Sequence, residues 1–155
     1  MRLADYITSD HIKIGLEGRN KDEVIEELVE LCSEVCDVSD PDAVLQAVLN
    51  RERDGSTGLE KGVAIPHAKS DAVGTLSIVV GISREGIDFE AQDGKPSHLF
   101  FLLVAPTSES GPHVQAIAKI VKLIKIDNFR EQMINAQTPE DVVKVINSAE
   151  NGEEE

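Results

Sequence analysis

Apolar and polar residues follow one another along this chain with two different periods, and each period indicates one class of secondary structure. Residues 12–14 alternate apolar, polar, apolar, which is the two-residue period of a short strand. Continuous apolar runs predict strands buried on both faces over residues 76–82 and 99–104. Residues 63–65 form a further short buried strand, and Pro66 ends it because proline has no N–H to give to a sheet.

Apolar residues spaced three and four positions apart predict helices, and capping residues indicate where they start. Asn20 followed by Glu23 has the pattern of a capping box. Asp40 places a capping residue directly before a proline of the first helical turn, and Thr138 does the same near the end of the chain. The predicted helices span residues 20–35, 40–54, 113–124, 129–134 and 138–146.

The order of these elements is a strand, two helices, a run of strands with turns at 84–86 and 93–94, and then helices. This order predicts one α/β or α+β domain in which helices cover a sheet. A length of 155 residues suits a single domain. We expect residues 1–148 to form this domain and the acidic residues 149–155 to form a disordered tail.

Composition narrows the class of protein. Apolar residues make up 41% of the chain and charged residues 28%, which is typical of a soluble globular protein. The formal charge of −14 argues against binding to nucleic acid and fits a partner with a basic patch. The N-terminus has no apolar signal segment, and the longest apolar run, residues 99–105, is too short to span a bilayer. We therefore expect a cytoplasmic protein that does not insert into the membrane.

Two weak motifs are set aside. Cys32 and Cys36 lie four apart on a predicted helix, so both can face the core, and no second cysteine pair completes a metal site. A disulfide is not expected in this compartment. The loop 54–58 with Lys61 and Gly62 has the wrong glycine spacing for a nucleotide phosphate loop.

His67 is the histidine that the pattern singles out. It follows the rigid Pro66 at the end of a short buried strand, where an imidazole can act as a nucleophile, a base or a metal ligand. The same position also suits a histidine that only packs at a sheet edge. His113 starts a predicted helix, whereas we expect His11 on the surface and His98 at a sheet edge.

The stretch from Arg51 to Ala68 resembles the active-site signature of the enzyme IIA components of the bacterial phosphoenolpyruvate-dependent phosphotransferase system, in the fructose–mannitol–nitrogen class. It contains Gly55-Ser56-Thr57-Gly58-Leu59 and Gly62-Val63-Ala64-Ile65-Pro66-His67-Ala68. Three later pieces also fit: residues 86–89, residues 93–96, and residues 99–106 followed by His113. The resemblance covers the chain from residue 3 to about residue 148. It implies a mixed sheet sandwiched between helices in three layers.

The resemblance also implies a site and a partner. His67 would be the phosphoryl-accepting histidine, and its donor would be the phosphohistidine of an HPr-type carrier that enzyme I charges. The second active-site histidine of the family falls on His113, and the active-site arginine falls on Arg51. The phosphoryl group would pass to the IIB domain of a sugar permease, or its presence would regulate other proteins.

Phosphoryl transfer explains these residue types, because positioning and charge stabilisation do most of the catalysis. One neutral ring nitrogen of His67 must face the donor, while the other donates to a fixed acceptor. Arg51 offers a planar fork of donors to phosphoryl oxygens, and His113 offers one more at a helix start. Ser56 and Thr57 could add hydroxyl donors. No metal, nucleotide or other cofactor is required.

Each of these residues also has a purely structural interpretation. Arg51 can cap its helix end, and Arg53 is a rival on spacing alone. His113 can pack its helix start, and Ser56 and Thr57 can be turn residues.

Two other functions stay open on the sequence. One is a metal-dependent hydrolase that uses His67, His113 and an acid such as Asp54; the other is a docking module without chemistry. Within the phosphotransferase interpretation, the single-domain chain slightly favours a nitrogen-type regulatory carrier over a dedicated sugar-uptake subunit.

Overall fold

The computed structural model describes residues 1–109 and 111–154, with the side chains of residues 1–109 and 111–152. Two short 3-10 helices, η1 and η2, begin the chain and lead directly into the first strand. In chain order the elements are η1 (Leu3–Asp5), η2 (Ser9–His11), β1 (Ile12–Ile14), α1 (Lys21–Val35), α2 (Pro41–Arg53), β2 (Val63–Ala64), β3 (His67–Lys69), β4 (Ser77–Ile87), β5 (Ser97–Ala105), α3 (Gly111–Leu123), α4 (Phe129–Ile134) and α5 (Pro139–Glu154).

The strands of the described residues form one mixed sheet in the order β1-β4-β5-β2, with β3 also paired to β5. The long strands β4 and β5 are antiparallel, whereas β1 runs parallel to β4 and both β2 and β3 run parallel to β5. The mixed sheet implied by the resemblance is therefore confirmed.

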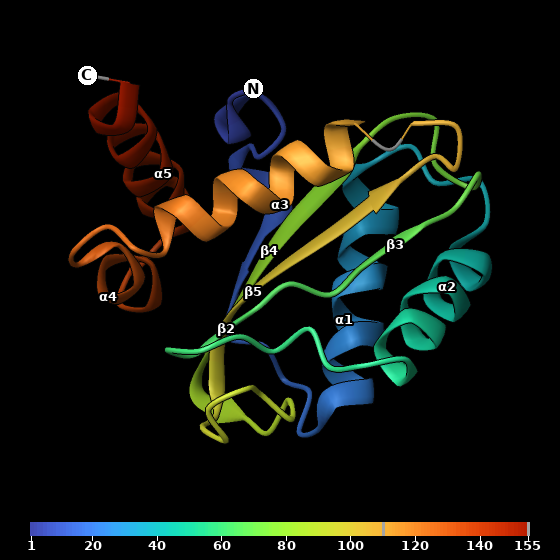
Figure 1. Ribbon diagram of the computed structural model, residues 1–155, viewed down its shortest axis with the longest axis horizontal. Coiled ribbons are helices and arrows are strands. Elements are labelled where there is room, and N and C mark those ends of the chain that lie inside the picture. The colour runs from blue at the N-terminus through green and yellow to red at the C-terminus, as the bar shows by residue number, and fades with distance from the viewer. Residues whose placement is uncertain (110, 155) are drawn as a thin grey trace.

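Helices cover both faces of this sheet, so the fold has three layers (Figure 1). One buried cluster joins α1 and α2 to the face that carries Phe100 and Leu102. A second cluster joins η1, α3, α4 and α5 to the opposite face, which carries Phe101 and Leu103. Because consecutive residues of a strand point to opposite faces, the uninterrupted apolar run of β5 supplies both clusters.

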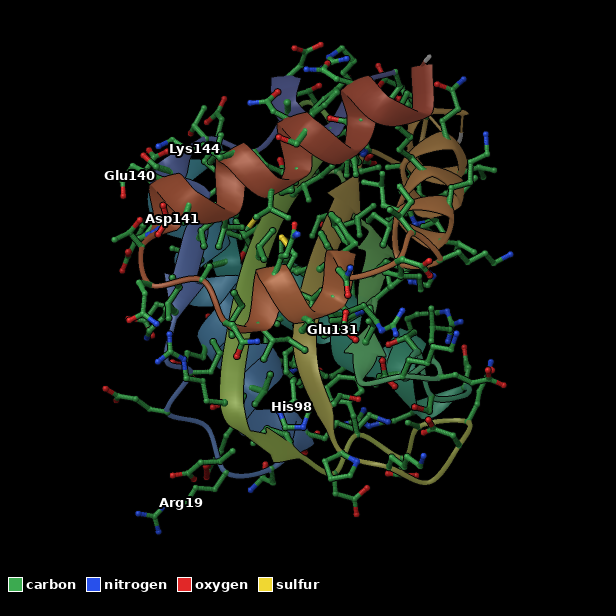
Figure 2. The ribbon with its side chains drawn as sticks, turned by 90° about the vertical axis from the view of Figure 1, so that its left-hand side faces the viewer. Arg19, His98, Glu131, Glu140, Asp141 and Lys144 are labelled. Atoms are coloured by element: carbon green, nitrogen blue, oxygen red, sulfur yellow. The ribbon has the colours of Figure 1, made fainter. Side chains whose placement is uncertain are left out.

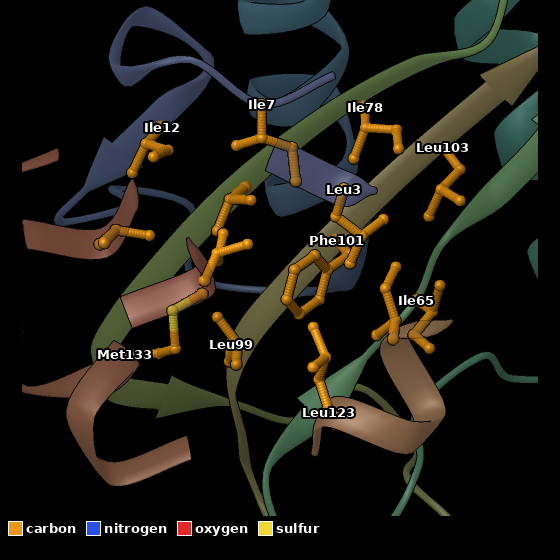
Figure 3. Packing of buried hydrophobic residues seen from close by; sticks show 14 of the residues in the cluster. Leu3, Ile7, Ile12, Ile65, Ile78, Leu99, Phe101, Leu103, Leu123 and Met133 are labelled. Atoms are coloured by element: carbon orange, nitrogen blue, oxygen red, sulfur yellow. The ribbon is translucent and has the colours of Figure 1, made fainter. Parts of the chain in front are cut away.

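Figure 3 shows the second cluster from close by. Leu99, Phe101 and Leu103 of β5 point into it with Ile78 of β4, and Leu123 and Met133 close it from the helix side. Its members are almost entirely aliphatic, as the low aromatic content of 3% requires.

The helix predictions are confirmed in position, and their caps explain the boundaries. Asn20 Oδ1 accepts the Glu23 N–H at 2.9 Å, and Glu23 Oε1 accepts the Arg19 N–H at 2.9 Å, one residue earlier than in the usual capping box. Asp40 caps α2 in the same way through the Ala43 N–H. Cys32 is buried in α1, whereas Cys36 is its half-buried C-cap residue; both thiols are free.

Two strand boundaries differ from the prediction. The turn predicted at 84–86 lies inside β4, because the strand absorbs extra residues at an irregularity between Ile82 and Ile87. Gly86 makes this possible with a φ of +86°, and a Cβ there would lie 2.8 Å from the His98 ring. Pro66 interrupts the strand but does not end it: its carbonyl accepts the Leu103 N–H at 3.1 Å, and β3 begins at His67.

The predicted domain boundary after residue 148 falls inside α5. Glu150 is fully buried, and its two carboxylate oxygens accept the backbone N–H groups of Leu3 and Ala4 at 2.8 and 2.9 Å. The two ends of the chain therefore lie near each other (Figure 1). The helix continues to Glu154, and Glu155 lies outside the described residues. Within the described part of the chain, no helix has the length and apolar character needed to cross a membrane.

Candidate functional site

His67 is held at the start of β3 by its own strand. Its Nδ1 lies 2.8 Å from the Ile65 carbonyl oxygen, which can only accept, so Nδ1 carries the proton and Nε2 is the ring nitrogen left free. Ile65 does not pair with β5 through its own N–H; that N–H donates instead to the Thr57 carbonyl at 3.0 Å. The interruption at Pro66 thus turns the Ile65 carbonyl toward the histidine that follows two residues later.

His113 lies opposite His67, in the first turn of α3. The two ring centroids are 5.0 Å apart, with the planes inclined at 51°. Nε2 of His113 is buried and has no hydrogen-bond partner among the described residues. A helix start also presents N–H groups that have no partner within the helix, which favours a negatively charged group. The two histidines, far apart in the sequence, therefore form one site.

The surroundings of both imidazoles favour the neutral form. Burial lowers the pKa of His67, and the nearby cation of Arg51 lowers it further, while the hydrogen bond to Ile65 acts in the opposite direction. Burial also lowers the pKa of His113, with smaller contributions from His67, Lys69 and Arg51. A neutral imidazole has a lone pair on one ring nitrogen, which is what a nucleophile needs.

Arg51, in the last turn of α2, is the arginine whose charge acts on both histidines. Its Nη1 donates to the Gly55 carbonyl at 2.9 Å, which holds the side chain over the loop that follows α2. Arg53, the rival on spacing alone, donates to Asn50 Oδ1 at 3.0 Å on its own helix. The sequence analysis did not single out Lys69, although Lys69 follows His67 by two residues and therefore lies on the same face of β3.

Ser56 and Thr57 use their hydroxyl protons within the protein. Ser56 Oγ donates to the Phe89 carbonyl at 2.6 Å, and Thr57 Oγ1 donates to Glu52. A hydroxyl has one proton to donate, so neither residue offers a donor to a phosphoryl oxygen in this arrangement. Both residues lie in the loop that follows α2.

Glu52 is a second residue of this region that the sequence analysis did not single out. Glu52 is only 7% exposed, and its carboxylate forms an ion pair with Lys21 Nζ of α1 at 2.7 Å. The signal in the sequence was its position next to Arg51 in the signature. A charged side chain on a helix is ordinarily solvent-exposed, so this position did not suggest a buried carboxylate.

The other two histidines lie elsewhere. His11 is half-buried rather than on the surface, and its Nδ1 lies 2.8 Å from the Ile78 carbonyl. His98 lies on β5, an interior strand of the sheet, with Nδ1 3.0 Å from the Ser83 carbonyl. Figure 2 shows it at one end of the sheet, beyond the helices α4 and α5.

The described residues contain no group of three or more histidine, cysteine, aspartate or glutamate side chains arranged to hold a metal ion. The hydrolase interpretation would need such a group around His67, His113 and Asp54.

Comparisons with known proteins identify the family of this chain. Residues 5–149 match the family model described as the phosphoenolpyruvate-dependent sugar phosphotransferase system, EIIA 2. The fructose-specific EIIA component of Haloferax volcanii is 36% identical over 126 residues, which is 81% of this chain and 82% of that protein. The fructose-specific EIIABC component of Bacillus subtilis is 33% identical over 95% of this chain, but the chain spans only 23% of that longer protein.

Solved structures show the same fold. The nitrogen regulatory protein IIA-Ntr from Neisseria meningitidis superposes with a TM-score of 0.85 at 29% identity, covering 93% of this chain and 98% of that one. Enzyme IIAMtl of Escherichia coli, solved in a complex with phosphorylated enzyme IIBMtl, gives a TM-score of 0.80 at 21% identity, over 92% of this chain and 97% of that one. Since the family model covers nearly the whole chain, we conclude that this protein belongs to the EIIA 2 family of the phosphoenolpyruvate-dependent sugar phosphotransferase system and is a phosphoryl-carrying component of it.

Proposed function

We propose that this protein carries its phosphoryl group on Nε2 of His67. The observation that supports this most directly is the 2.8 Å hydrogen bond between Nδ1 and the Ile65 carbonyl, which leaves Nε2 as the nitrogen with a lone pair. In the transfer, that lone pair forms a bond to phosphorus while the bond from phosphorus to the donor nitrogen breaks, and the donor ring keeps the electron pair. The proton on Nδ1 stays where it is.

Charge stabilisation comes from the residues around the two rings. The phosphoryl group spreads negative charge over three oxygens in the transition state. The His113 ring lies 5.0 Å from the His67 ring between centroids, and its Nε2 has no hydrogen-bond partner among the described residues. This nitrogen can therefore donate to one of the phosphoryl oxygens from the helix start. Arg51 can offer its remaining N–H donors to another oxygen.

The donor we propose is the phosphohistidine of an HPr-type carrier, and the acceptor is a IIB domain of a sugar permease. The enzyme IIAMtl structure, which binds phosphorylated IIBMtl, supports such an acceptor through the shared fold. A transfer between two histidines exchanges similar leaving groups, so it requires neither metal nor nucleotide. We also propose that the protein acts in the cytoplasm, where these partners are found.

A regulatory role is the second candidate, and the similarity to IIA-Ntr supports it. The fructose-specific relatives, at 36% and 33% identity, support uptake. Both roles use the same acceptor nitrogen, Nε2 of His67, and differ in which protein binds to the phosphorylated site. Phosphorylation adds about −1.5 to −2 charges there, enough to break or create a contact with a regulated protein.

The test is phosphorylation by phosphoenolpyruvate, enzyme I and an HPr-type carrier, with His67→Ala and His98→Ala compared. We expect an acid-labile phosphoryl group on the wild type and on His98→Ala, and none on His67→Ala. A phosphoryl group that persists in His67→Ala would contradict the assignment.

Adding a fructose-type IIB domain then separates the two roles. Transfer from phosphorylated His67 to IIB supports uptake. Failure of that transfer, together with capture of a sensor or kinase by only the phosphorylated or only the unphosphorylated protein, supports regulation.

A further inference from the structure

The buried carboxylate of Glu52 takes no part in the transfer described above, yet it lies one residue from Arg51. Its side chain is 4% exposed. Burial of a carboxylate is costly unless hydrogen-bond donors surround it, and three donors surround this one. Oε2 accepts the Thr57 N–H at 2.8 Å and pairs with Lys21 Nζ at 2.7 Å, and Oε1 accepts the Thr57 hydroxyl.

A continuous set of hydrogen bonds runs from this carboxylate to the His67 ring. The Thr57 N–H donates to Glu52, and the Thr57 carbonyl accepts the Ile65 N–H at 3.0 Å. The Ile65 carbonyl then accepts Nδ1–H of His67 at 2.8 Å. The Ile65 side chain is buried in the cluster drawn in Figure 3, so its backbone is held from the other side as well.

Lys21 fixes the outer end of this set. Its Nζ lies 5.0 Å from the ring centroid of Phe89, and the Phe89 carbonyl accepts the Ser56 hydroxyl at 2.6 Å. Three separate parts of the chain therefore meet at the loop that carries Ser56 and Thr57: the first turn of α1, the last turn of α2, and the segment after β4.

Resting on the function proposed above, we propose that Glu52, through Thr57, is a positioning residue for phosphoryl transfer. It holds the Ile65 carbonyl in place, and that carbonyl keeps the His67 proton on Nδ1 and directs Nε2 toward the incoming phosphoryl group. It contacts neither the reacting nitrogen nor the phosphoryl oxygens.

A second effect of the same carboxylate is electrostatic. The negative charge of Glu52 raises the pKa of His67, against the larger lowering by burial. Removing that charge should therefore lower the pKa of His67 further. A residue that only stabilised the fold would not change both the pKa of His67 and the ring nitrogen that carries its proton.

The experiment compares Glu52→Gln with Asp54→Asn, which removes the same charge from an exposed residue at the end of the same helix. The amide has one acceptor oxygen where the carboxylate has two. Because it is neutral, it cannot form an ion pair with Lys21. We expect Glu52→Gln to accept the phosphoryl group about 10 to 100 times more slowly in a single turnover, while Asp54→Asn reacts at the wild-type rate.

The readout specific to positioning is nitrogen NMR of His67 in the unphosphorylated protein. The wild type should show the tautomer protonated on Nδ1, and Glu52→Gln should show a mixture of the two tautomers and a lower pKa. A folded Glu52→Gln with the wild-type rate overturns the proposal. So does a slow Glu52→Gln whose His67 tautomer and pKa are unchanged, because its effect would then be structural only.

Should Glu52→Gln not fold, Thr57→Val and Thr57→Ser replace it. Val removes only the hydroxyl that bonds to Glu52, and Ser keeps it, so we expect the slow rate and the mixed tautomer in Val alone. Equal behaviour of the two variants overturns the proposal. The proposed function fails separately, if His67→Ala still accepts a phosphoryl group.

Discussion

At the scale of single residues, the chemistry that we propose depends on two histidines that face each other in surroundings that favour the neutral ring. His67 has one nitrogen committed to a carbonyl oxygen, whereas the buried Nε2 of His113 has no partner among the described residues. These different hydrogen-bond environments support the different roles that we propose for the two rings. One ring is oriented for attack, and the other is left with a polar atom that a phosphoryl oxygen would satisfy.

The assignment of His113 can be tested by truncation. His113→Ala should transfer phosphoryl groups about 10²–10³-fold more slowly, because it removes one preorganised donor from the transition state. Its free energy of unfolding should stay near the wild-type value, since His113 is half-buried in a first helical turn. Gln115→Ala, an exposed residue of the same helix, is the control for the helix itself. A wild-type transfer rate in His113→Ala would make this histidine a packing residue.

The pH dependence of phosphoryl acceptance follows from the direction of the His67 pKa. Burial lowers that pKa, and only the neutral ring can attack. The rate should therefore decline as the pH falls, with a midpoint below the ordinary histidine pKa of about 6.5. Single-turnover rates with a carrier phosphorylated in advance measure this, alongside an NMR titration of His67. A midpoint at or above 6.5 would contradict the burial argument.

At the scale of elements, the signature works because α2, a loop and two short parallel strands are joined in sequence. Arg51 lies in the last turn of α2, the loop turns back through Ser56 and Thr57, and β2 and β3 pair with β5. Gly58 is required where the loop passes close to the segment after β4, since a Cβ there would lie 2.9 Å from Ala91 Cα. Packing against the segment after β4 therefore determines the conformation of this loop.

The last helix carries a prediction about stability. Glu150 accepts two backbone N–H groups of η1 from a fully buried position, with Lys119 Nζ at 3.8 Å. Glu150→Gln would set amide hydrogens against one of these donors and leave it unsatisfied, which should lower the free energy of unfolding by about 1–3 kcal/mol.

Urea unfolding measures this change, and Glu26→Gln on the exposed face of α1 serves as the control, expected within about 0.5 kcal/mol of wild type. A chain truncated after residue 148 should lose at least as much stability as Glu150→Gln. If Glu150→Gln and Glu26→Gln unfold at the same urea concentration, this contact does not stabilise the protein.

At the scale of the whole molecule, a strongly acidic protein surrounds a locally cationic site. The formal charge is −14, yet the cation of Arg51 acts on both histidines and that of Lys69 acts on His113. The overall field attracts a partner with a basic patch, while the local cations suit a phosphoryl group. The encounter with such a partner therefore depends on the negative charge of the whole protein, whereas binding of a phosphoryl group depends on the positive charges at the site.

This separation predicts a salt effect on encounter alone. Raising the ionic strength from low to about 0.5 M should reduce the second-order rate constant of phosphorylation by the carrier about 10- to 100-fold, because screening weakens electrostatic steering. The single-turnover rate at saturating carrier should change little. Stopped-flow measurements at several salt concentrations test both statements, and a second-order rate constant independent of salt would rule out steering.

Much of this protein is determined by its sequence alone, because the relevant interactions are local. The helix positions, the caps at Asn20 and Asp40, and the buried character of β5 follow from residues a few positions apart. The signature from Arg51 to Ala68 likewise identifies the family and the candidate histidine, since its residues are nearly contiguous.

Tertiary structure alone decided the features that join residues distant in the chain. A bulge with Gly86 keeps β4 running through a predicted turn, and the N-terminus needs Glu150 from a segment that composition alone assigns to a disordered tail. The proton of the Thr57 hydroxyl could have gone to a ligand, but the packing of α2 gives it to Glu52. A side chain's chemistry is set by its sequence, whereas its hydrogen-bond partners depend on which backbone and side-chain groups the fold brings within reach.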